Sequence, residues 1–448
     1  MFFSFRKWLT GQFGGTQCRQ SSRRSLRRRL EAEQLEGRLA PAIITINTAD
    51  DSNTRDTILT LREAMLVANG ELPKANLTAQ EKAQVDGDPT GASFDTIKFA
   101  IGNGAQTVSL RANLGPLPIL DAGPVIIDGT PPGAFPNQTI TIDGTNVAAG
   151  NNAHGLVLGA TANGSASGSS VLGLTIQNFK RSGIQINNTS NNKIGGSQQA
   201  ENNIIKLNNI GIEIKGTSAQ GNSVVGNFLL DNKVIVANGG GWGVLIDGGA
   251  RGNVIGKEAP VNKDGVIMTP ANVISGNEAA GVAIINKNST ENVIIGNFIG
   301  LEADGETARP NKVQGVAIQN AFGNFIGGLR AGERNIISKN VGAGVEITGK
   351  TATGNFVQGN YIGTKRDGTG NLGNAKGVFF PGGENAASGN KVKKSKIKSN
   401  LADAVDDPDQ KNQIFDPNSI SGNGYGINHG GSLDLNQAKP PVLGGERP

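Results

Sequence analysis

The chain repeats a short block in which two Asn residues enclose a run of β-branched residues. The block N-V-I-S-G-N at 272–277 returns as N-I-I-S-K-N at 335–340, and a G-V-x-I segment follows each copy. Three such units open at Asn203, Asn272 and Asn335, which lie 69 and 63 residues apart. A fixed period of short apolar segments is typical of a solenoid, in which each repeat packs only on its neighbours. The repeat therefore restricts the chain to a repetitive architecture.

A second Asn follows the opening one after 20 residues, at Asn292 and at Asn355. We interpret this interval as one coil of about 20 residues. The apolar segments alternate in the way of β-strands with one inward face. Helices are disfavoured because 66 of the 448 residues are Gly, which is costly in a helix and useful at corners that need a positive φ.

These features predict an all-β fold, a single-stranded right-handed parallel β-helix of roughly a dozen coils with a short N-terminal helical cap. The chain has no six-residue beat of a left-handed β-helix, no leucine-rich frame and no calcium-binding nonapeptide. Parallel crossovers favour right-handed coiling.

Asn residues stand at the corners between the predicted strands. Asn tolerates the left-handed conformation, and its amide can donate to and accept from an identical amide one coil away. We therefore predict a structural asparagine ladder and not a catalytic set. The residues concerned are Asn272, Asn292, Asn335, Asn355, Asn360 and Asn390.

The residues before the repeats have a different character. Residues 43–47 are predicted to form a strand, and residues 61–68 a helix, because they include good helix formers and no breaker. A solenoid end exposes strand edges and an apolar interior, so we expect this helix to cover it. The expected divisions are a leader (1–41), a cap with the first rungs (42–150), β-helix repeats (151–430) and a C-terminal tail (431–448).

Positive charge is concentrated in the leader. The first 40 residues hold 9 Lys and Arg against 3 Asp and Glu, which leaves 33 against 34 for the remainder. The body therefore lacks the basic excess typical of nucleic-acid binding. The single cysteine, Cys18, lies in the leader, so no disulfide framework is expected. No apolar run is long enough for a membrane span.

The leader also lacks the apolar stretch of an ordinary secretory signal. Arg residues at 23–24 and 27–29 precede L-E-A-E-Q-L-E-G-R at 30–38. This order resembles the N-terminal leader of many exported planctomycete proteins, in which a basic run precedes an L-E-x-L-E-x-R-like segment. The resemblance implies export to the cell surface or the medium. A basic amphipathic helix is the alternative.

The segment L-T-L-R-E-A-M at 59–65 resembles the C-S-L-R-E-A-I signature that opens many secreted bacterial β-helix proteins, with Leu59 in place of Cys. Residues 94–99, 125–129 and 140–144 resemble the rungs that follow it. With the repeats, the resemblance to the pectin-lyase-like superfamily covers about residues 43–440. It implies a right-handed β-helix and export, and does not by itself imply an enzyme.

A glycoside hydrolase of this fold would need two carboxylates at matching positions on nearby coils, which stack about 4.8 Å apart. No column of acids is evident at the outward position of the G-V-x-I strands. Asp304 and Asp367 repeat, three coils apart by our estimate, but Asp-Gly is more typical of a turn. His154 and His429, the only histidines, are weak candidates for a base. The outward positions are Gln185, Glu213, Leu245, Ala283, Ala317, Glu346 and Phe379.

A lyase would need acids that bind a cation and a basic residue. Both occur late in the chain, although a charged outer face beside a solvated loop accounts for them more simply. The acids are Asp403, Asp406, Asp407 and Asp409, and the lysines are Lys391, Lys393, Lys394, Lys396 and Lys398.

Aromatic residues make up 4% of the chain, so exposed rings are informative. Trp242 follows a Gly corner, and in the pair Phe379 and Phe380 strand alternation requires one ring to face outward. These three are our candidates for carbohydrate binding, with filling of gaps beside the β-helix as the alternative. Phe298, Phe325 and Phe356 are expected in the core.

We therefore expect an exported, extracellular or cell-surface β-helix protein with a structural or adhesive role that binds a polysaccharide or cell-surface glycan. The alternative is a polysaccharide lyase or glycoside hydrolase, and an enzyme is the less favoured interpretation. We expect no cofactor, no structural metal, no nucleic-acid partner and no membrane span. The sequence leaves the oligomeric state open.

Overall fold

The computed structural model describes residues 41–89, 94–134, 136–150, 152–161, 164–235, 239–415, 418–429 and 432–434. The chain divides into two units, and all described residues belong to the second unit, Leu39–Pro448. Apart from Pro41, the predicted leader with Cys18 lies outside the described residues, as does most of the predicted tail.

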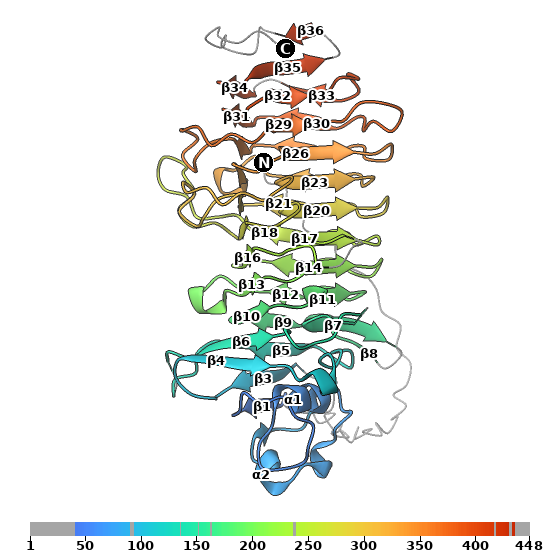
Figure 1. The fold of residues 1–448 in the computed structure, drawn as a ribbon, viewed down its shortest axis with the longest axis vertical. Coiled ribbons are helices and arrows are strands. Elements are labelled where there is room, and N and C mark those ends of the chain that lie inside the picture. Colours follow the sequence, from blue (N-terminus) through green and yellow to red (C-terminus); the bar gives the residue numbers. More distant parts are fainter. Residues whose placement is uncertain are drawn as a thin grey trace, which may run out of the picture. The chain divides into compact units, whose positions relative to one another are not determined.

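The strands of the second unit enter three sheets in rotation, and most strands pair in parallel with the strand one coil earlier and one coil later. Figure 1 shows β14, β17, β20, β23 and β26 stacked one above the other. The chain thus winds into a right-handed parallel β-helix, which confirms the predicted fold class.

Sheet A begins with an antiparallel pair, β1 and β2, and continues as parallel strands. Its members are β2 (Val85–Asp86), β1 (Ile43–Ile46), β3 (Asp95–Phe99), β5 (Val125–Asp128), β9 (Ser170–Leu172), β12 (Lys193–Ile194), β15 (Ser223–Val224), β18 (Val254–Gly256), β21 (Val293–Ile295), β24 (Phe325–Ile326), β27 (Phe356–Gln358), β30 (Lys391–Lys393) and β33 (Gln413–Ile414).

Sheet B is parallel throughout. It contains β4 (Ala105–Ser109), β6 (Thr139–Asp143), β10 (Leu174–Gln177), β13 (Ile204–Lys206), β16 (Phe228–Leu230), β19 (Val273–Ser275), β22 (Phe298–Ile299), β25 (Ile336–Ile337), β28 (Tyr361–Ile362), β31 (Lys396–Lys398) and β34 (Ser419–Ser421).

Sheet C is parallel except for an antiparallel strand at each end. It contains β8 (Gly164–Ser165), β7 (Leu156–Thr161), β11 (Ser182–Asn187), β14 (Ile210–Lys215), β17 (Trp242–Asp247), β20 (Val282–Ile285), β23 (Val316–Gln319), β26 (Ala343–Thr348), β29 (Lys376–Phe379), β32 (Asp403–Asp406), β35 (Tyr425–His429) and β36 (Ser432–Asp434).

The core is the space enclosed by the three sheets. Each coil contributes one or two β-branched or Leu side chains per strand, and the paired inward positions form continuous columns such as Ile274, Ile299 and Ile337 in sheet B. Burial of these columns against one another is the main hydrophobic contribution to stability.

One coil is longer than the predicted length of about 20 residues. Equivalent positions in sheet A, such as Val254, Val293, Phe325 and Phe356, lie 39, 32 and 31 residues apart. The 20-residue interval joins two different corners of the β-helix, and the 63-residue unit spans two coils. The predicted length was wrong because the same Asn-apolar pattern marks all three corners of a coil. The spacing of the pattern therefore measures the distance between corners and not the length of a coil.

Each corner carries its own asparagine ladder. Asn292 Nδ2, for example, donates to Asn324 Oδ1 at 3.1 Å and to Ala250 O at 3.1 Å, while Asn292 Oδ1 accepts from the backbone N and the Nδ2 of Asn253, both at 3.0 Å. The predicted ladder is confirmed, and it is threefold. Its rows are Asn203, Asn227, Asn272, Asn297, Asn335 and Asn360 before sheet B; Asn192, Asn222, Asn253, Asn292, Asn324, Asn355, Asn390 and Asn412 before sheet A; and Asn208, Asn232, Asn277, Asn311, Asn340, Asn374, Asn400 and Asn423 before sheet C.

Among the described residues the α-helices are α1 (Leu61–Ala68) and α2 (Ala79–Lys82), with 3-10 turns at Lys74–Asn76, Ala112–Leu114, Gln199–Glu201 and Ala331–Glu333. The helix predicted for residues 61–68 is thus confirmed. Its Leu61, Ala64 and Met65 join the core beside β1 and β3, as expected of a cap. Within the described ranges, no helix combines the length and apolar character needed to cross a membrane.

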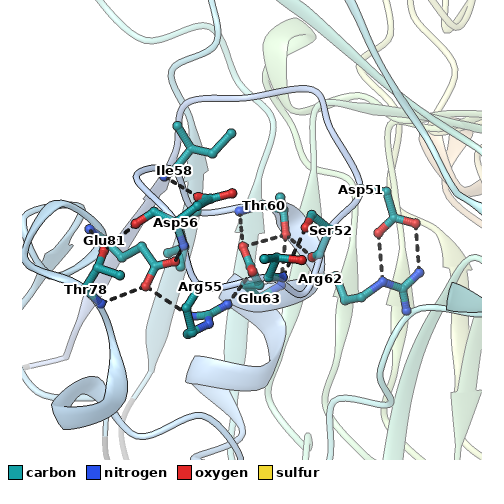
Figure 2. A network of polar contacts seen from close by, with 12 residues as sticks. Asp51, Ser52, Arg55, Asp56, Ile58, Thr60, Arg62, Glu63, Thr78 and Glu81 are labelled. Atoms are coloured by element: carbon teal, nitrogen blue, oxygen red, sulfur yellow. Dashed lines mark hydrogen bonds and ion pairs between the residues drawn. The ribbon is translucent and has the colours of Figure 1, made fainter.

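A network of buried charges fixes this cap (Figure 2). Thr60 is the N-cap residue of α1, and Thr78 is the N-cap residue of α2. Each forms a capping box, in which the glutamate at N3 accepts a hydrogen bond from the backbone N–H of the threonine. Arg55 joins the two glutamates, Glu63 and Glu81. These contacts show why the segment at 59–65 holds a Thr and a Glu at those positions.

Candidate functional site

The outer face of sheet A carries a column of side chains that changes from aliphatic to aromatic to basic. The parallel register places Val254, Val293, Phe325, Phe356 and Lys391 on successive coils. Their chain neighbours on β18 to β30, such as Ile294 and Val392, point inward and are fully buried. The column is therefore an exterior stripe.

Phe325 and Phe356 stack on each other in this stripe, with ring centroids 5.1 Å apart and an angle of 6° between the ring planes. Both rings are half-buried. The prediction that they belong to the core was wrong, since Ile326 and Val357 occupy the inward positions. Alternation within each strand, counted from the ladder Asn, was the signal that could have placed them outside.

Phe298 was also predicted in the core, and it is fully buried. Its ring lies on the outer face of sheet B, in a separate apolar cluster with Ile267, Leu301 and Ile336. Two long loops, 257–271 and 300–315, supply the covering side chains. This part of sheet B is therefore sealed by the chain itself.

Five lysines follow Phe356 on the next coil, and we call them the lysine belt: Lys391, Lys393, Lys394, Lys396 and Lys398. Val392 and Ile397 are fully buried, so the lysines of β30 face outward from sheet A and those of β31 face outward from sheet B. Lys394 lies between the two strands with a φ of 51°. Within the described part of the chain, no belt lysine lies within 4.0 Å of a carboxylate oxygen.

An open hollow of about 270 Å³ on sheet A is lined by Phe356, Phe415, Lys391, Lys393 and Lys394. The Nζ atoms of Lys391 and Lys393 each lie 5.3 Å from the centroid of Phe356. Phe415, which is 42% exposed, lines the other side with Lys394. The hollow therefore combines aromatic rings with positive charge, and no carboxylate of the described residues lies within 4.0 Å of these lysines.

On sheet B, the ring of Tyr361 also lies beside a lysine of the belt. The Arg334 guanidinium lies 3.8 Å from the ring centroid of Tyr361, and Lys396 Nζ lies 5.4 Å from it. Arg334 also donates to Gly265 O at 3.0 Å. Burial lowers the pKa of Arg334, and the Tyr361 hydroxyl partly opposes this shift. The basic surface thus continues around the corner between the two sheets.

Trp242, a candidate from the sequence, lies on the outer face of sheet C. It is half-buried and packs with Ile210, Leu245 and Ala283. A Cβ at Gly239 would lie 3.0 Å from the rim of the indole, which explains the Gly at that position. Trp242 thus lies away from the lysine belt, on another sheet.

Phe379 is the last residue of β29, and Phe380 follows it. Phe379 is half-buried on the outer face of sheet C, and Lys376 Nζ lies 3.5 Å from its ring centroid. Phe380 is 1% exposed and belongs to the core, so it has no face to offer a ligand. Four coils separate Phe379 from Trp242, or about 19 Å at the usual strand spacing.

The acids proposed for a lyase are not gathered with the lysines. Asp406 pairs with Lys376 and accepts from Asn428 Nδ2 at 2.8 Å, both on sheet C. Asp407 accepts from the backbone N and Nδ2 of Asn412, both at 3.0 Å, and so ends one asparagine ladder. Asp409 pairs with Lys411. These acids have structural partners and do not converge on one point.

The outward column predicted for sheet C is confirmed by the register of β11, β14, β17, β20, β23, β26 and β29. Asp406 extends it. Glu346 and Asp406 therefore stand two coils apart, about 9.6 Å, near the ~6.5–9.5 Å separation of inverting glycosidases. Glu346 accepts from Gln314 at 3.0 Å.

Asp304 and Asp367 occupy turns, as expected, two coils apart. Each accepts hydrogen bonds from a nearby Thr: Thr307 donates to Asp304 through its backbone N at 2.8 Å, and Thr369 donates to Asp367 through its backbone N at 2.7 Å. Such hydrogen bonds lower the pKa of Asp304. His154 is buried at a corner, where its Nδ1 accepts from Ser182 N at 3.3 Å.

No protein-family model matches the chain, and no curated protein matches it. Among solved structures, it is similar to the A-module of the Azotobacter vinelandii mannuronan C-5 epimerase AlgE6, at 13% identity over 78% of this chain and 92% of that chain, with a TM-score of 0.46. It is also similar to the periplasmic alginate epimerase AlgG (12% identity, 78% and 69% covered, TM-score 0.38) and to an alginate lyase from Paenibacillus sp. (13%, 77% and 92%, 0.30). Identities of this size concern the fold alone.

Proposed function

We propose that the protein is an exported β-helix that binds an anionic polysaccharide through the lysine belt and the Phe325–Phe356 stack. The observation that carries this proposal is the set of five lysines on adjoining faces of β30 and β31 that lack carboxylate partners among the described residues.

The chemistry of the belt suits a carboxylated or sulfated sugar chain. Ammonium groups attract anions over about 8–10 Å at moderate salt, and the aromatic faces beside them accept the C–H face of a sugar ring. Lysines supply point charges on flexible stems, which suits a polymer with repeated anionic groups more than a single planar ligand.

Retention on a uronic-acid polymer would test this function. The protein should lack residues 1–40, because the leader's own Arg residues would bind any polyanion. A variant with Lys393→Gln, Lys394→Gln and Lys396→Gln should lose about tenfold in affinity, or roughly 1.4 kcal/mol, and show a weaker salt dependence. The matched control changes three exposed lysines elsewhere, Lys82, Lys263 and Lys350, to Gln and should bind normally.

A chemically modified polymer controls for the role of the ligand's charge. A carboxyl-reduced form of the same polymer keeps the sugar backbone and loses the charge, so it should bind far more weakly. Duplex DNA of similar charge should also bind less well, because it has no pyranose ring whose C–H face could pack on Phe356. Equal binding of the two triple-Gln variants would refute the assignment of the belt.

Trp242 and Phe379 are proposed as secondary contacts for the same chain on sheet C. Trp242→Ala should then weaken retention by less than the belt variant does. Lys376 lies beside the ring of Phe379, so an anionic sugar that packs on this ring would also contact a positive charge.

The alternative of a hydrolase rests on the spacing of Glu346 and Asp406. If it holds, Glu346→Gln or Asp406→Asn abolishes release of reducing sugar by the unmodified protein. A lyase would instead release unsaturated products. Either product would replace the binding function with an enzyme, and fractionation of cells that express the full chain would test export.

A further inference from the structure

A second polar surface lies at the corner where sheet C leads into sheet A. On four successive coils, the residue two places before the ladder Asn is Gln220, Arg251, Thr290 and Phe322. Gln220 and Arg251 pair as a parallel bridge, so the column keeps the register of the sheets. The side chains of this corner are spaced by one coil, about 4.8 Å.

Two adjoining hollows of about 340 and 430 Å³ open along this corner. Arg251 lines both of them. Phe322, which is 39% exposed, borders the first, and Glu291 borders the second. The remaining side chains around them are amides and hydroxyls, such as those of Asn288 and Gln220.

The two charges of this corner balance each other. Arg251 and Glu291 are both exposed, and across the described ranges neither side chain has an ion pair or hydrogen bond. The corner therefore has no net charge, in contrast to the lysine belt. A guanidinium and a carboxylate with free donors and acceptors can both bond to hydroxyl groups.

Glu291 is held in a strained backbone conformation. Its φ is 60°, in the left-handed region that suits Gly and Asn. On the other coils the equivalent position is Asn or Gly with a positive φ, except at the last coil, where it is Lys411: the Asn and Gly residues are Asn191, Gly221, Gly252, Gly323, Gly354 and Gly389. Glu291 thus places a carboxylate where the two neighbouring coils have Gly.

We propose that this corner is a second glycan-binding site, selective for a neutral, hydroxyl-rich sugar chain that runs along the stack of coils. One coil advances by about the length of one sugar unit in an extended glycan. The ring of Phe322 takes the face of one sugar, while Arg251 and Glu291 bond to hydroxyls of the next units. The site differs from the lysine belt in position and in ligand charge.

Titration of the full-length protein with neutral hexasaccharides of glucose, mannose, galactose and xylose would test the proposal. Binding of at least one is expected, and Phe322→Ala should weaken it about tenfold, the loss of one aromatic contact. Thr353→Ala changes the same column outside the hollows and should leave the affinity unchanged.

Glu291→Gly separates a ligand contact from a structural one. Gly relieves the strained φ, so the midpoint of thermal unfolding should rise, while the affinity for the hexasaccharide should fall. If Glu291 does not contact the ligand, the midpoint should rise while the affinity stays unchanged. That result would overturn the assignment of Glu291.

The two sites can fail independently. The triple-Gln variant of the lysine belt should keep its affinity for the neutral hexasaccharide, and Phe322→Ala should keep its affinity for the uronic-acid polymer. Failure of all four neutral hexasaccharides to bind, or binding that Phe322→Ala leaves intact, would overturn the corner site without touching the belt.

Discussion

At the scale of single residues, the ladder asparagines show how a polar side chain becomes part of a core. Asn292 is fully buried, yet its amide makes two donor bonds and accepts two, so no polar atom of the side chain is left unpaired. Buried amides are costly only when unpaired. The same geometry recurs along the three ladders, and Ser395 takes the ladder position between Asn360 and Asn418.

Asn292→Leu should therefore lower the free energy of unfolding by more than about 3 kcal/mol, because it leaves several buried donors and acceptors unpaired at ~1–3 kcal/mol each. Asn288→Leu, the same change at an exposed position, should stay within about 0.5 kcal/mol. Chemical denaturation of the two variants would measure the difference. Equal stabilities would show that the ladder is not a stabilising element.

The adjacent phenylalanines of β29 give a second prediction. Phe380→Ala removes a ring from the core and should cost about 3–5 kcal/mol, whereas Phe379→Ala removes a half-exposed ring and should cost less than about 1.5 kcal/mol. Thermal unfolding of both variants tests the inward placement of Phe380. A larger loss for Phe379→Ala would contradict the alternation of this strand.

At the scale of elements, the N-terminal cap is held by charge as well as by apolar packing. Arg62 binds Asp51 through two hydrogen bonds of 2.7 and 3.0 Å, and Arg55 joins Glu63 to Glu81. Burial raises the pKa of Glu63, and it outweighs the hydrogen bonds from Thr60 and the charge of Arg55. The stability of the cap should thus depend on pH through a buried carboxyl.

The sign of this dependence follows from the raised pKa. The contribution of Glu63 is full below the pKa of the unfolded chain, about 4.3, and is lost as the pH rises through the higher pKa of the folded state. Arg55→Met would raise that pKa further. We expect it to destabilise the protein by about 2–3 kcal/mol at pH 7, and by clearly less at pH 4.5.

The control for the cap is Arg111→Met. Arg111 pairs with Asp50 at 3.7 Å on the surface, with 54% of its side chain exposed, and such pairs contribute about 0–1 kcal/mol. Its unfolding midpoint should change little at either pH. A loss for Arg55→Met that is the same at pH 4.5 and pH 7 would show that Glu63 does not titrate as argued.

At the scale of the whole β-helix unit, the sequence repeat and the structural repeat differ. The 63-residue unit comprises two coils, because Phe298, Ile336 and Tyr361 follow one another in sheet B. Long loops alternate between coils, which makes every second coil alike. Stacked coils contact only their neighbours, so stability is nearly a sum over coils.

Deletion of residues 298–360 tests this period. The cut removes two whole coils and joins Asn297 to Tyr361, which takes the position of Phe298 in sheet B, so the three sheets and ladders can close again. The shortened protein should keep its β-type circular dichroism and unfold cooperatively. Deletion of residues 272–291, the 20-residue interval, shifts the corners out of register and should prevent folding.

The sequence alone determined the architecture. Asn-apolar blocks with Gly predicted parallel coils and the ladders, and the breaker-free segment 61–68 predicted the cap helix with its bounds. These features are local: strand alternation, corner conformation and helix capping are decided within a few residues. The placement of the outward column from Gln185 to Phe379 followed from alternation in the same way.

Only the tertiary structure decided the length of a coil and the location of the surfaces. Three corners share one local pattern, so the chain's own spacing could not show which Asn lies above which. For the same reason the lysine belt could not be joined to Phe356, 35 residues before Lys391. The misplacement of Phe325 and Phe356 was different, because local alternation would have placed both rings outside. Contacts between coils depend on how long loops bring distant segments into register, and that information is not local to any segment.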